Sequence, residues 1–199
     1  MATVAVAKSR EEGQPQVFLV DPPWAYNARN NPGTRFCLGV HGHYPVMTVE
    51  EICALSVKSI AAPDAVLFLW GTWPKLPWAL RVMESWGFTY KTVGFVWVKV
   101  NKDGSPWFGV GYYQKSNTEF CLLGTRGKVL KPATNGVSQI ILAQRGPHSQ
   151  KPEEARRRIE LLYPTQRKVE LFARQEAEGW TCLGNEIDGQ DLREVLSVR

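Results

Sequence analysis

The sequence predicts an α/β fold built on a mostly parallel, doubly wound sheet. Short apolar runs of strand length recur along the chain, and segments with helical apolar spacing alternate with several of them. This alternation is typical of parallel strands whose sheet is covered by helices on both faces. The chain has 199 residues, so we expect a polar, flexible N-terminus at residues 1–15 and a single domain at residues 16–199.

The first part of the chain begins with a strand and continues as a long loop. QVFLVD at residues 16–21 is a short apolar run, and the Asp-Pro-Pro sequence at its end stops a strand. Residues 24–44 are rich in Asn, Gly, Arg and His without periodicity, which predicts a long loop of the kind that often carries function. Thr48 and Glu51 form a capping box, so we expect a helix from there to about Ser59.

The middle of the chain supplies two strands, one helix and a second loop. AVLFLW at residues 65–70 predicts a buried strand. Apolar residues at positions 76, 79, 80, 83 and 86 share one face of a predicted helix, and Gly87 ends it. The alternating sequence TVGFVWVKV at residues 92–100 predicts a strand. Residues 101–117, which carry several Gly, Trp and Tyr residues, predict a loop.

The last part of the chain repeats this alternation. Pro152 suits the first turn of a helix whose apolar face is formed by Ala155, Ile159 and Leu162. The remaining apolar runs predict strands at residues 119–125, 139–144, 168–173 and 180–185, followed by a short closing helix at residues 191–198. In sheets of this kind ligands bind beyond the carboxyl ends of the strands, so we expect the functional site there.

Composition and charge limit the class of protein. The net charge of +5 permits a polyanionic partner without requiring one. The eight tryptophans indicate a Trp-rich core, with a few rings that could serve as stacking surfaces for bases. The sequence contains neither a signal peptide nor an apolar stretch of membrane-spanning length, so we expect a cytoplasmic protein.

The four cysteines, Cys37, Cys53, Cys121 and Cys182, do not have the spacing of a metal site. Cys53, Cys121 and Cys182 lie within apolar patterns, which predicts buried thiols in a reducing compartment. We therefore expect no zinc or other metal site.

The tetrapeptide Asp21-Pro22-Pro23-Trp24 contains groups that suit methylation of an exocyclic amine. The lone pair of the adenine amine is delocalised into the ring, so an enzyme must accept the amine's hydrogens to free the nitrogen for attack. Asp21 offers a carboxylate and Pro22 a carbonyl, while Trp24 offers a ring that can stack on a flipped base. By itself the tetrapeptide fits equally well an inert proline turn that ends a strand.

Three further motifs carry charged or polar side chains that could bind parts of a ligand. HSQKPEE at residues 148–154 places Lys151 and free backbone N–H groups at a helix start, where a carboxylate could bind. KVELFAR places Glu170 and Arg174 at a strand end, and LGNEIDG presents Asn185 and Glu186 for a ribose diol or an adenine edge. Taken singly, each motif is more typical of a solvated surface than of a site.

Taken together and in order, DPPW, HSxKP, ELFxR and WxxLGNxxDG resemble the DPPW adenine-N6 methyltransferase family. That family includes the catalytic subunit of the eukaryotic messenger-RNA adenosine methyltransferase and bacterial and phage relatives. The resemblance extends from about Val17 to Gly189. It implies a Rossmann-like class I methyltransferase fold in permuted order, with the catalytic half first and the cofactor half last, and S-adenosylmethionine as the cofactor.

The resemblance also implies roles for individual residues. The catalytic residues would be Asp21, Pro22, Pro23 and Trp24. The residues around the cofactor would be Asp21, Lys151, Glu170, Arg174, Asn185 and Glu186, with Lys151 on the methionine carboxylate and Glu186 standing where the eukaryotic enzyme has Gln. Substrate contacts would come from Trp24, Tyr26, His41, Tyr44, Lys99, Tyr112, Lys115 and Asn117. Between Arg174 and Trp180 the chain is shorter than the eukaryotic enzyme and lacks its His-Asn pair.

These implications predict an S-adenosylmethionine-dependent enzyme that methylates the N6 amine of adenine in DNA by direct in-line transfer, without a metal. The alternatives are methylation of adenosine in RNA, and a non-catalytic nucleic-acid-binding subunit that partners an active enzyme. A cytosine-N4 methyltransferase is disfavoured because the corresponding turn usually begins with Ser rather than Asp. The expected partner is nucleic acid, with DNA favoured over RNA, and a homodimer is possible.

Overall fold

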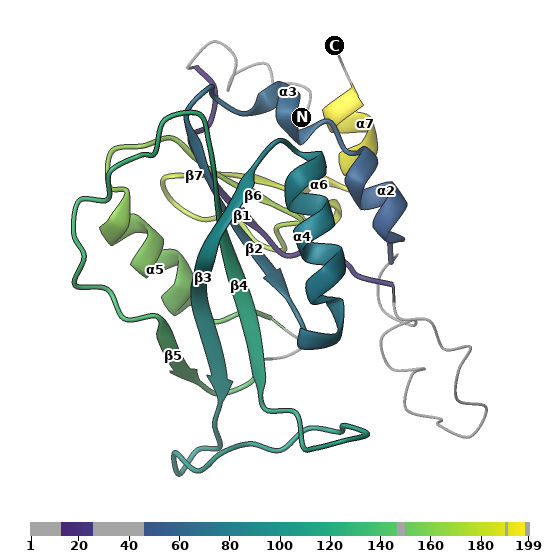
Figure 1. Cartoon of the computed structure of the whole chain (residues 1–199), viewed down its shortest axis with the longest axis vertical. Helices are drawn as coiled ribbons and strands as arrows, with labels where there is room; N and C mark the ends of the chain where they lie inside the picture. Colours follow the sequence, from purple (N-terminus) through teal and green to yellow (C-terminus); the bar gives the residue numbers. More distant parts are fainter. Residues whose placement is uncertain (1–12, 26–45, 147–149, 190, 198–199) are drawn as a thin grey trace.

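The computed structural model describes residues 13–25, 46–146, 150–189 and 191–197, and Figure 1 shows their arrangement. Seven strands form one sheet in the order β5-β3-β4-β2-β1-β6-β7. The strands are β1 (Val17–Val20), β2 (Ala65–Gly71), β3 (Thr89–Lys99), β4 (Thr118–Arg126), β5 (Ile140–Ala143), β6 (Lys168–Leu171) and β7 (Trp180–Leu183). β4 pairs antiparallel with both of its neighbours, and every other pair is parallel. The predicted mostly parallel α/β sheet is therefore confirmed.

Helices cover both faces of this sheet (Figure 1). They are α2 (Val49–Ala54), α3 (Val57–Ile60), the 3-10 helix η3 (Trp73–Lys75), α4 (Leu76–Ser85), α5 (Glu153–Leu162), α6 (Asn185–Asp188) and α7 (Leu192–Ser197). Residues of α2, α3, α4 and α7 form a core cluster with one face of the sheet. Residues of α5 form a second cluster with the other face.

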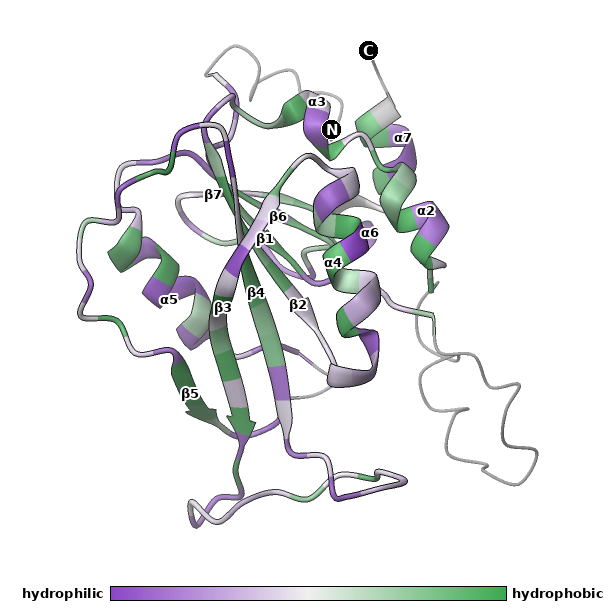
Figure 2. Cartoon of the chain, in the orientation of Figure 1, coloured by the Kyte–Doolittle hydropathy of each residue, from purple (hydrophilic) through white to green (hydrophobic). Residues whose placement is uncertain are grey.

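The alternation of side chains along β1 produces these two clusters. Phe18 and Val20 point into the first cluster, whereas Val17 and Leu19 point into the second. All four residues are buried because β1 lies between β2 and β6 with helices on both sides. Figure 2 shows the same pattern as hydrophobic strands at the centre of the molecule. The short apolar runs of the sequence are thus the buried strands of the sheet.

Several boundaries differ from the sequence predictions. The capping box of Thr48 and Glu51 is present, but the helix ends at Ala54. Leu55 takes an extended conformation and is buried, so the chain leaves the helix to place this side chain in the core. A separate helix, α3, follows. The predicted helix at 48–59 is therefore two short helices.

The apolar face of α4 is also turned slightly from the prediction. Ala79, Val82 and Met83 are buried, whereas Leu80 is exposed. Gly87 has a φ of +80° and closes the helix as expected. Trp86 is fully buried and its Nε1 donates to the Ile52 carbonyl at 3.0 Å, which ties α4 to α2.

The second half of the chain has two further differences. β6 ends at Leu171 instead of continuing to residue 173, because Phe172 adopts the left-handed conformation with a φ of 60°. The short helix α6 was not predicted, and it begins directly after β7 at Asn185. Both changes lie at the carboxyl edge of the sheet.

The prediction of buried thiols is confirmed for one of the three cysteines that the structure describes. Cys121 is fully buried, and burial raises the pKa of its thiol well above the usual value. Cys53 and Cys182 are half-buried, because each lies at the margin of its core cluster. Cys37 lies outside the described residues.

The direction of the strands brings several segments to one edge. β1, β2, β6 and β7 run parallel, so their carboxyl ends share this edge. β4 runs the opposite way and therefore begins there, next to the carboxyl end of β3. Within the described part of the chain, no helix is both long and apolar enough to cross a membrane.

Candidate active site at the carboxyl ends of β1 and β6

The Asp-Pro-Pro-Trp turn follows β1 directly and is held by backbone hydrogen bonds. The Trp24 N–H donates to the Pro22 carbonyl at 2.9 Å, which closes a tight turn. The Met47 N–H donates to the Pro23 carbonyl at 2.8 Å, and the Ala25 N–H donates to the Met47 carbonyl at 2.9 Å. The turn is therefore fixed on both sides by residue 47, which precedes α2.

Trp24 anchors this turn to the sheet. Trp24 is only 5% exposed, and its Nε1 donates to the Trp70 carbonyl of β2 at 3.2 Å. The indole belongs to the core cluster that β1 shares with α2 and α4. In this structure the ring therefore has a structural role, and its stacking on a target base stays a prediction.

Lys75 holds the end of the same turn and was missed in the sequence. Although it is a lysine, it is only 5% exposed. Its Nζ donates to the Ala25 carbonyl at 2.7 Å and lies 3.4 Å from the centre of the Trp78 ring. Burial lowers the pKa of this amine. Nothing in the local pattern distinguishes Lys75 from a solvated lysine, because its burial depends on contacts with residues 50 positions earlier.

Four charged side chains form a row that starts at Asp21. The Lys151 Nζ lies 2.8 Å from Asp21 Oδ2 and 3.3 Å from Glu119 Oε2. The Lys99 Nζ lies 2.6 Å from Glu119 Oε1. We call Asp21, Lys151, Glu119 and Lys99 the charge row. Its members alternate in sign, so every charge has a partner of the opposite sign.

The surroundings of the charge row keep its inner members ionised. Burial lowers the pKa of Lys151, but the carboxylates of Asp21 and Glu119 raise it by more, so it lies above its usual 10.5. Burial raises the pKa of Glu119, but Lys151 and Lys99 lower it by more, so it lies below its usual 4.5. At neutral pH Lys151 is therefore a cation and Glu119 an anion.

Glu119 is the member of the row that the sequence prediction did not include among the site residues. It stands at the start of β4, in a run that reads as an ordinary buried strand. A buried acid in such a run was the available signal, because buried carboxylates need a partner. Only the antiparallel direction of β4 brings its first residues to the edge where Asp21 lies.

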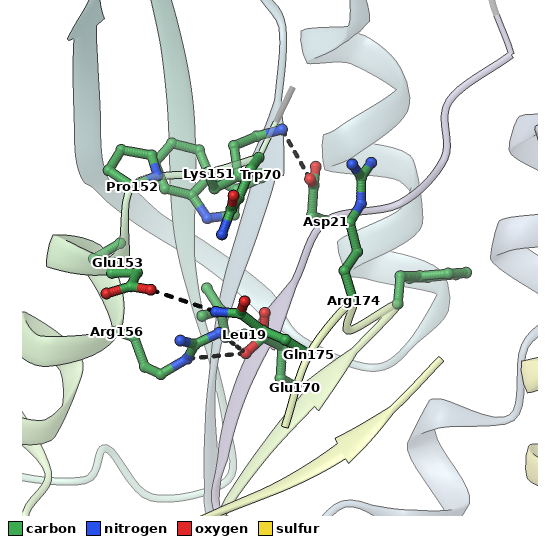
Figure 3. Close-up of a pocket in the computed structure, with 13 residues that line it drawn as sticks. Leu19, Asp21, Trp70, Lys151, Pro152, Glu153, Arg156, Glu170, Arg174 and Gln175 are labelled. Carbon is green, nitrogen blue, oxygen red and sulfur yellow. Dashed lines mark hydrogen bonds and ion pairs between the residues drawn. The ribbon is translucent and has the colours of Figure 1, made fainter. Parts of the chain in front are cut away.

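A pocket opens beside Asp21, between α5 and the ends of β1 and β6 (Figure 3). Four of the predicted cofactor residues line it: Asp21, Lys151, Glu170 and Arg174. The wall also contains Leu19, Trp70, Gln150, Pro152, Glu153, Ala155, Arg156, Phe172 and Gln175. It therefore combines apolar surface with charges of both signs.

Glu170 is fixed on one side of this pocket by Arg156 of α5. The Arg156 Nε and Nη2 atoms both donate to Glu170 Oε2, at 3.0 and 2.6 Å (Figure 3). Burial raises the pKa of Glu170, and Arg156 offsets part of this rise. The pair ties α5 to β6 across the floor of the pocket.

Asn185 and Glu186 adjoin the pocket without lining it. Glu186 Oε1 lies 3.5 Å from the Arg174 Nε, so the two predicted residues are in contact. Asn185 is exposed at the start of α6, and its carbonyl accepts the Gly189 N–H at 3.0 Å. The structure thus brings the motifs around residues 151, 170, 174 and 186 to the same edge as Asp21.

The residues predicted to contact the substrate are less closely grouped than those predicted to bind the cofactor. Lys99 belongs to the charge row, and Asn117 is half-buried beside it, with its carbonyl accepting the Lys99 N–H at 2.8 Å. Tyr112 and Lys115 are exposed on the loop between β3 and β4. Tyr26, His41 and Tyr44 lie outside the described residues, as do His148 and Ser149 of the HSQKPEE motif.

Comparisons with known proteins identify the family of the chain. The family model described as MT-A70 matches residues 15–186. The type II methyltransferase M.MunI of Mycoplasma sp. is 37% identical over 186 residues, which cover 86% of this chain and 77% of that protein. A probable N(6)-adenosine-methyltransferase MT-A70-like of Oryza sativa subsp. japonica is 31% identical over 90% of this chain. The human N(6)-adenosine-methyltransferase catalytic subunit METTL3 is 28% identical over 90% of this chain. The match spans 24% of the rice protein and 29% of the human protein.

Proposed function

The chain belongs to the MT-A70 family, and from this premise we propose that it transfers a methyl group from S-adenosylmethionine to the N6 amine of adenine in DNA. The observation that carries the proposal is the position of Asp21. Its carboxylate lies at the carboxyl edge of the sheet, beside a pocket lined by charges of both signs and apolar surface. This is the place where an amine acceptor and a cofactor site must meet.

The turn offers the acceptors that an adenine amine needs. The Asp21 carboxylate and the Pro22 carbonyl follow one another in the chain, and both oxygens can accept N–H hydrogens. The Pro22 carbonyl already accepts one bond from Trp24, and a carbonyl oxygen has a second lone pair. Fixed acceptors of this kind act mainly by positioning and by stabilising developing charge.

Lys151 forms an ion pair with the Asp21 carboxylate at 2.8 Å and holds it at the edge of the pocket (Figure 3). An ionised carboxylate accepts hydrogen bonds and donates none, so it suits an amine that must give up both of its N–H hydrogens to acceptors. Glu119 holds Lys151 from the other side. Asp21 therefore does not have to reorient when a base enters.

The residues in and beside the pocket fit S-adenosylmethionine. Lys151 would hold the carboxylate of its methionine end and Arg174 would contact its ribose and adenosine end, whereas Glu170 and Glu186 would accept hydrogen bonds from its hydroxyl or ammonium groups. Asn185 would bind the nucleoside end, and Leu19 and Phe172 offer apolar surface. When bound, the cofactor supplies an activated methyl group on a sulfonium centre. The chain's own part is to orient that group toward the amine held by Asp21 and Pro22.

We favour DNA as the polymer on the basis of similarity. The chain is 37% identical to the type II methyltransferase M.MunI and matches 77% of its length. RNA is the second candidate, because relatives named N(6)-adenosine-methyltransferases are 28–31% identical over about nine-tenths of this chain. A non-catalytic role is disfavoured because the chain retains Asp21 in contact with Lys151.

One experiment tests the proposed reaction and the polymer together. The protein is incubated with cofactor labelled on the methyl group and with single- and double-stranded DNA and RNA oligonucleotides of the same sequence. The products are digested to nucleosides and the labelled species is identified. We expect N6-methyldeoxyadenosine. Label in N4-methyldeoxycytidine, or in RNA without any in DNA, would contradict the proposal.

A further inference from the structure

The loop at residues 101–117, which we call the aromatic loop, exposes large rings to solvent. Phe108 is 63% exposed, Tyr112 is 88% exposed and Tyr113 is 90% exposed. Phenylalanine and tyrosine normally bury most of their surface, and clustered exposure of such rings marks a binding surface. Tyr112 and Tyr113 contact each other edge to face, with ring centres 5.0 Å apart.

Backbone hydrogen bonds give the aromatic loop a defined shape. The Trp107 N–H donates to the Lys99 carbonyl at 2.9 Å, and the Gly109 N–H donates to the Ser116 carbonyl at 2.8 Å. A Cβ on Gly109 would lie 2.4 Å from the Ser116 oxygen, so only glycine allows this approach. The first bond folds residues 100–106 back onto the end of β3, and the second closes residues 110–115 as a separate turn. The second bond holds Tyr112 and Tyr113 at the tip of that turn.

Positive charge accompanies the rings. The Trp107 ring lies 4.3 Å from the Arg145 guanidinium carbon and 5.6 Å from the Lys99 Nζ, so cations flank it. The loop itself carries Lys102 and Lys115 against one acid, Asp103. Aromatic rings interleaved with cations are the pattern by which proteins bind single-stranded nucleic acid.

The base of the aromatic loop adjoins the charge row. Lys99 ends β3, supports Trp107 through its carbonyl and pairs with Glu119 through its Nζ. Glu119 is joined through Lys151 to Asp21. The pocket proposed for the cofactor lies toward α5 and β6. The aromatic loop extends from β3 and β4, on the opposite side of Asp21 in the strand order.

We propose that the aromatic loop is a stacking surface for unpaired bases, which binds a single-stranded stretch of the substrate next to the target adenine. This inference rests on the proposed function and specifies its substrate. Tyr112, Tyr113 and Phe108 stack on bases, while Lys102, Lys115 and Arg145 contact phosphates. A base inside a duplex has both faces covered by its neighbours, so these rings contribute to binding only where the strand is unpaired.

The test compares binding of single-stranded and double-stranded probes. The probes are a fluorescein-labelled deoxyoligonucleotide containing one adenine and the same strand annealed to its complement. The variant Tyr112→Ala/Tyr113→Ala removes both rings, and Tyr112→Phe/Tyr113→Phe keeps the rings without the hydroxyls. Tyr90→Ala is the matched control, because Tyr90 is exposed near the other end of β3. Fluorescence anisotropy gives the dissociation constants.

We expect the alanine variant to lose affinity for the single strand by about 10-fold or more, with little change for the duplex. The phenylalanine variant and Tyr90→Ala should bind as the unchanged protein does. Unchanged single-strand affinity in the alanine variant would overturn the inference, as would an equal loss on both probes. A change in sedimentation mass with unchanged binding would instead assign the rings to a protein contact, which also overturns it.

A methylation assay separates failure of this inference from failure of the proposed function. We expect the alanine variant to raise KM for the single-stranded oligonucleotide while kcat stays close to that of the unchanged protein. If the unchanged protein methylates the probe and the alanine variant has the same KM, the inference alone fails. If the unchanged protein neither binds nor methylates any DNA or RNA probe, both fail.

Discussion

Asp21 combines two properties that a substitution can separate, its negative charge and its ability to accept hydrogen bonds at both oxygens. Asp21→Asn keeps the size but places an N–H group where an acceptor is needed. We expect the methyl-transfer rate to fall about 100-fold or more while the circular dichroism spectrum stays unchanged. Single-turnover measurements with saturating cofactor check this.

Asp64→Asn is a suitable control for the Asp21 variant. Asp64 Oδ1 accepts the Lys128 N–H at 2.7 Å, and the asparagine retains that acceptor. Asp64 precedes β2, at the opposite edge of the sheet from Asp21. We expect its variant to methylate at the original rate. An Asp21→Asn enzyme that does so too would remove the turn from the mechanism.

Lys151 and Asn185 belong to the cofactor end of the proposed site. We expect Lys151→Ala to weaken S-adenosylmethionine binding by about 1.5–3 kcal/mol, the cost of a lost charge-assisted hydrogen bond, and Asn185→Ala by about 0.5–1.5 kcal/mol, the cost of a neutral one. Isothermal titration calorimetry without nucleic acid measures this. Lys91→Ala is the control, because Lys91 is exposed on β3. Unchanged affinity in both variants would place the cofactor elsewhere.

Glu119 links the charge row to the stability of the fold. Glu119→Gln leaves Lys99 without its carboxylate and Lys151 with Asp21 alone, so we expect a loss of about 3 kcal/mol in the free energy of unfolding at neutral pH. The Glu119 pKa is lowered in the fold, so its contribution is present above its usual 4.5 and is lost as the pH falls through the folded value. The difference between the two proteins should therefore shrink under acid conditions.

Urea denaturation of both proteins at neutral pH and below the pKa of Glu119 measures this difference. Acidification protonates Glu119 in the unchanged protein, which then resembles the glutamine variant. A stability difference that stays constant or grows on acidification would show that Glu119 does not act through its charge.

At the scale of secondary structure, the ends of β6 and β7 shape the cofactor side of the site. Gly184 follows β7, and a Cβ there would lie 2.3 Å from the Ala173 oxygen and 2.7 Å from the Ala173 nitrogen. The Ala173 N–H also donates to the Leu183 carbonyl at 3.0 Å. The close contact of these two strand ends places Phe172 and Arg174 at the pocket while Asn185 starts α6.

Gly184→Ala should therefore push the two strand ends apart. We expect a destabilisation of about 1–3 kcal/mol, typical of an added methylene in a packed position, together with weaker cofactor binding. Thermal unfolding and calorimetry measure the two effects. Gly136→Ala is the control, since its Cβ would meet only the Thr134 hydroxyl oxygen at 3.5 Å. If both variants behave alike, close backbone contact at Gly184 is not required.

Phe172 is the second distinctive residue of this edge. Its φ of 60° is unusual for a residue with a large side chain and costs free energy. The strain ends β6 early and turns the chain so that Phe172 lines the pocket. Strained residues of this kind gather at functional sites, which agrees with the position proposed for the cofactor.

At the scale of the whole molecule, the net charge of +5 and the exposed lysines of the aromatic loop favour binding through phosphate contacts. We expect methylation to fall steeply with added salt, because each phosphate contact releases counterions. Unpaired or mismatched sites should be methylated at least as fast as paired ones, since a target base must leave its stack to reach Asp21. Initial rates on matched single-stranded, mismatched and duplex DNA over a salt series test both expectations. Rates independent of salt, or highest on the perfect duplex, would contradict them.

The sequence by itself predicted most of the strands and helices and the residue types of the proposed site. Strands such as β1 and β2 are apolar throughout because both faces of the sheet are covered, and this leaves a clear local signal. The capping box at Thr48 could also be predicted from the sequence, because its two hydrogen bonds join residues only three positions apart. The motifs around Asp21, Lys151, Glu170 and Arg174 could be predicted because their residue types and order resemble those of one family.

Only the tertiary structure decided which groups surround these residues. Lys151 contacts Asp21 across 130 positions of the chain, and Glu119 joins them because β4 runs antiparallel to β2. Burial of Lys75 and Trp24 likewise depends on contacts with distant segments. Strand direction and long-range pairing arise when the sheet assembles and leave no periodic pattern in the sequence. A local pattern therefore predicted that Asp21 follows a strand, whereas the partners that hold its carboxylate in place were visible only in the folded chain.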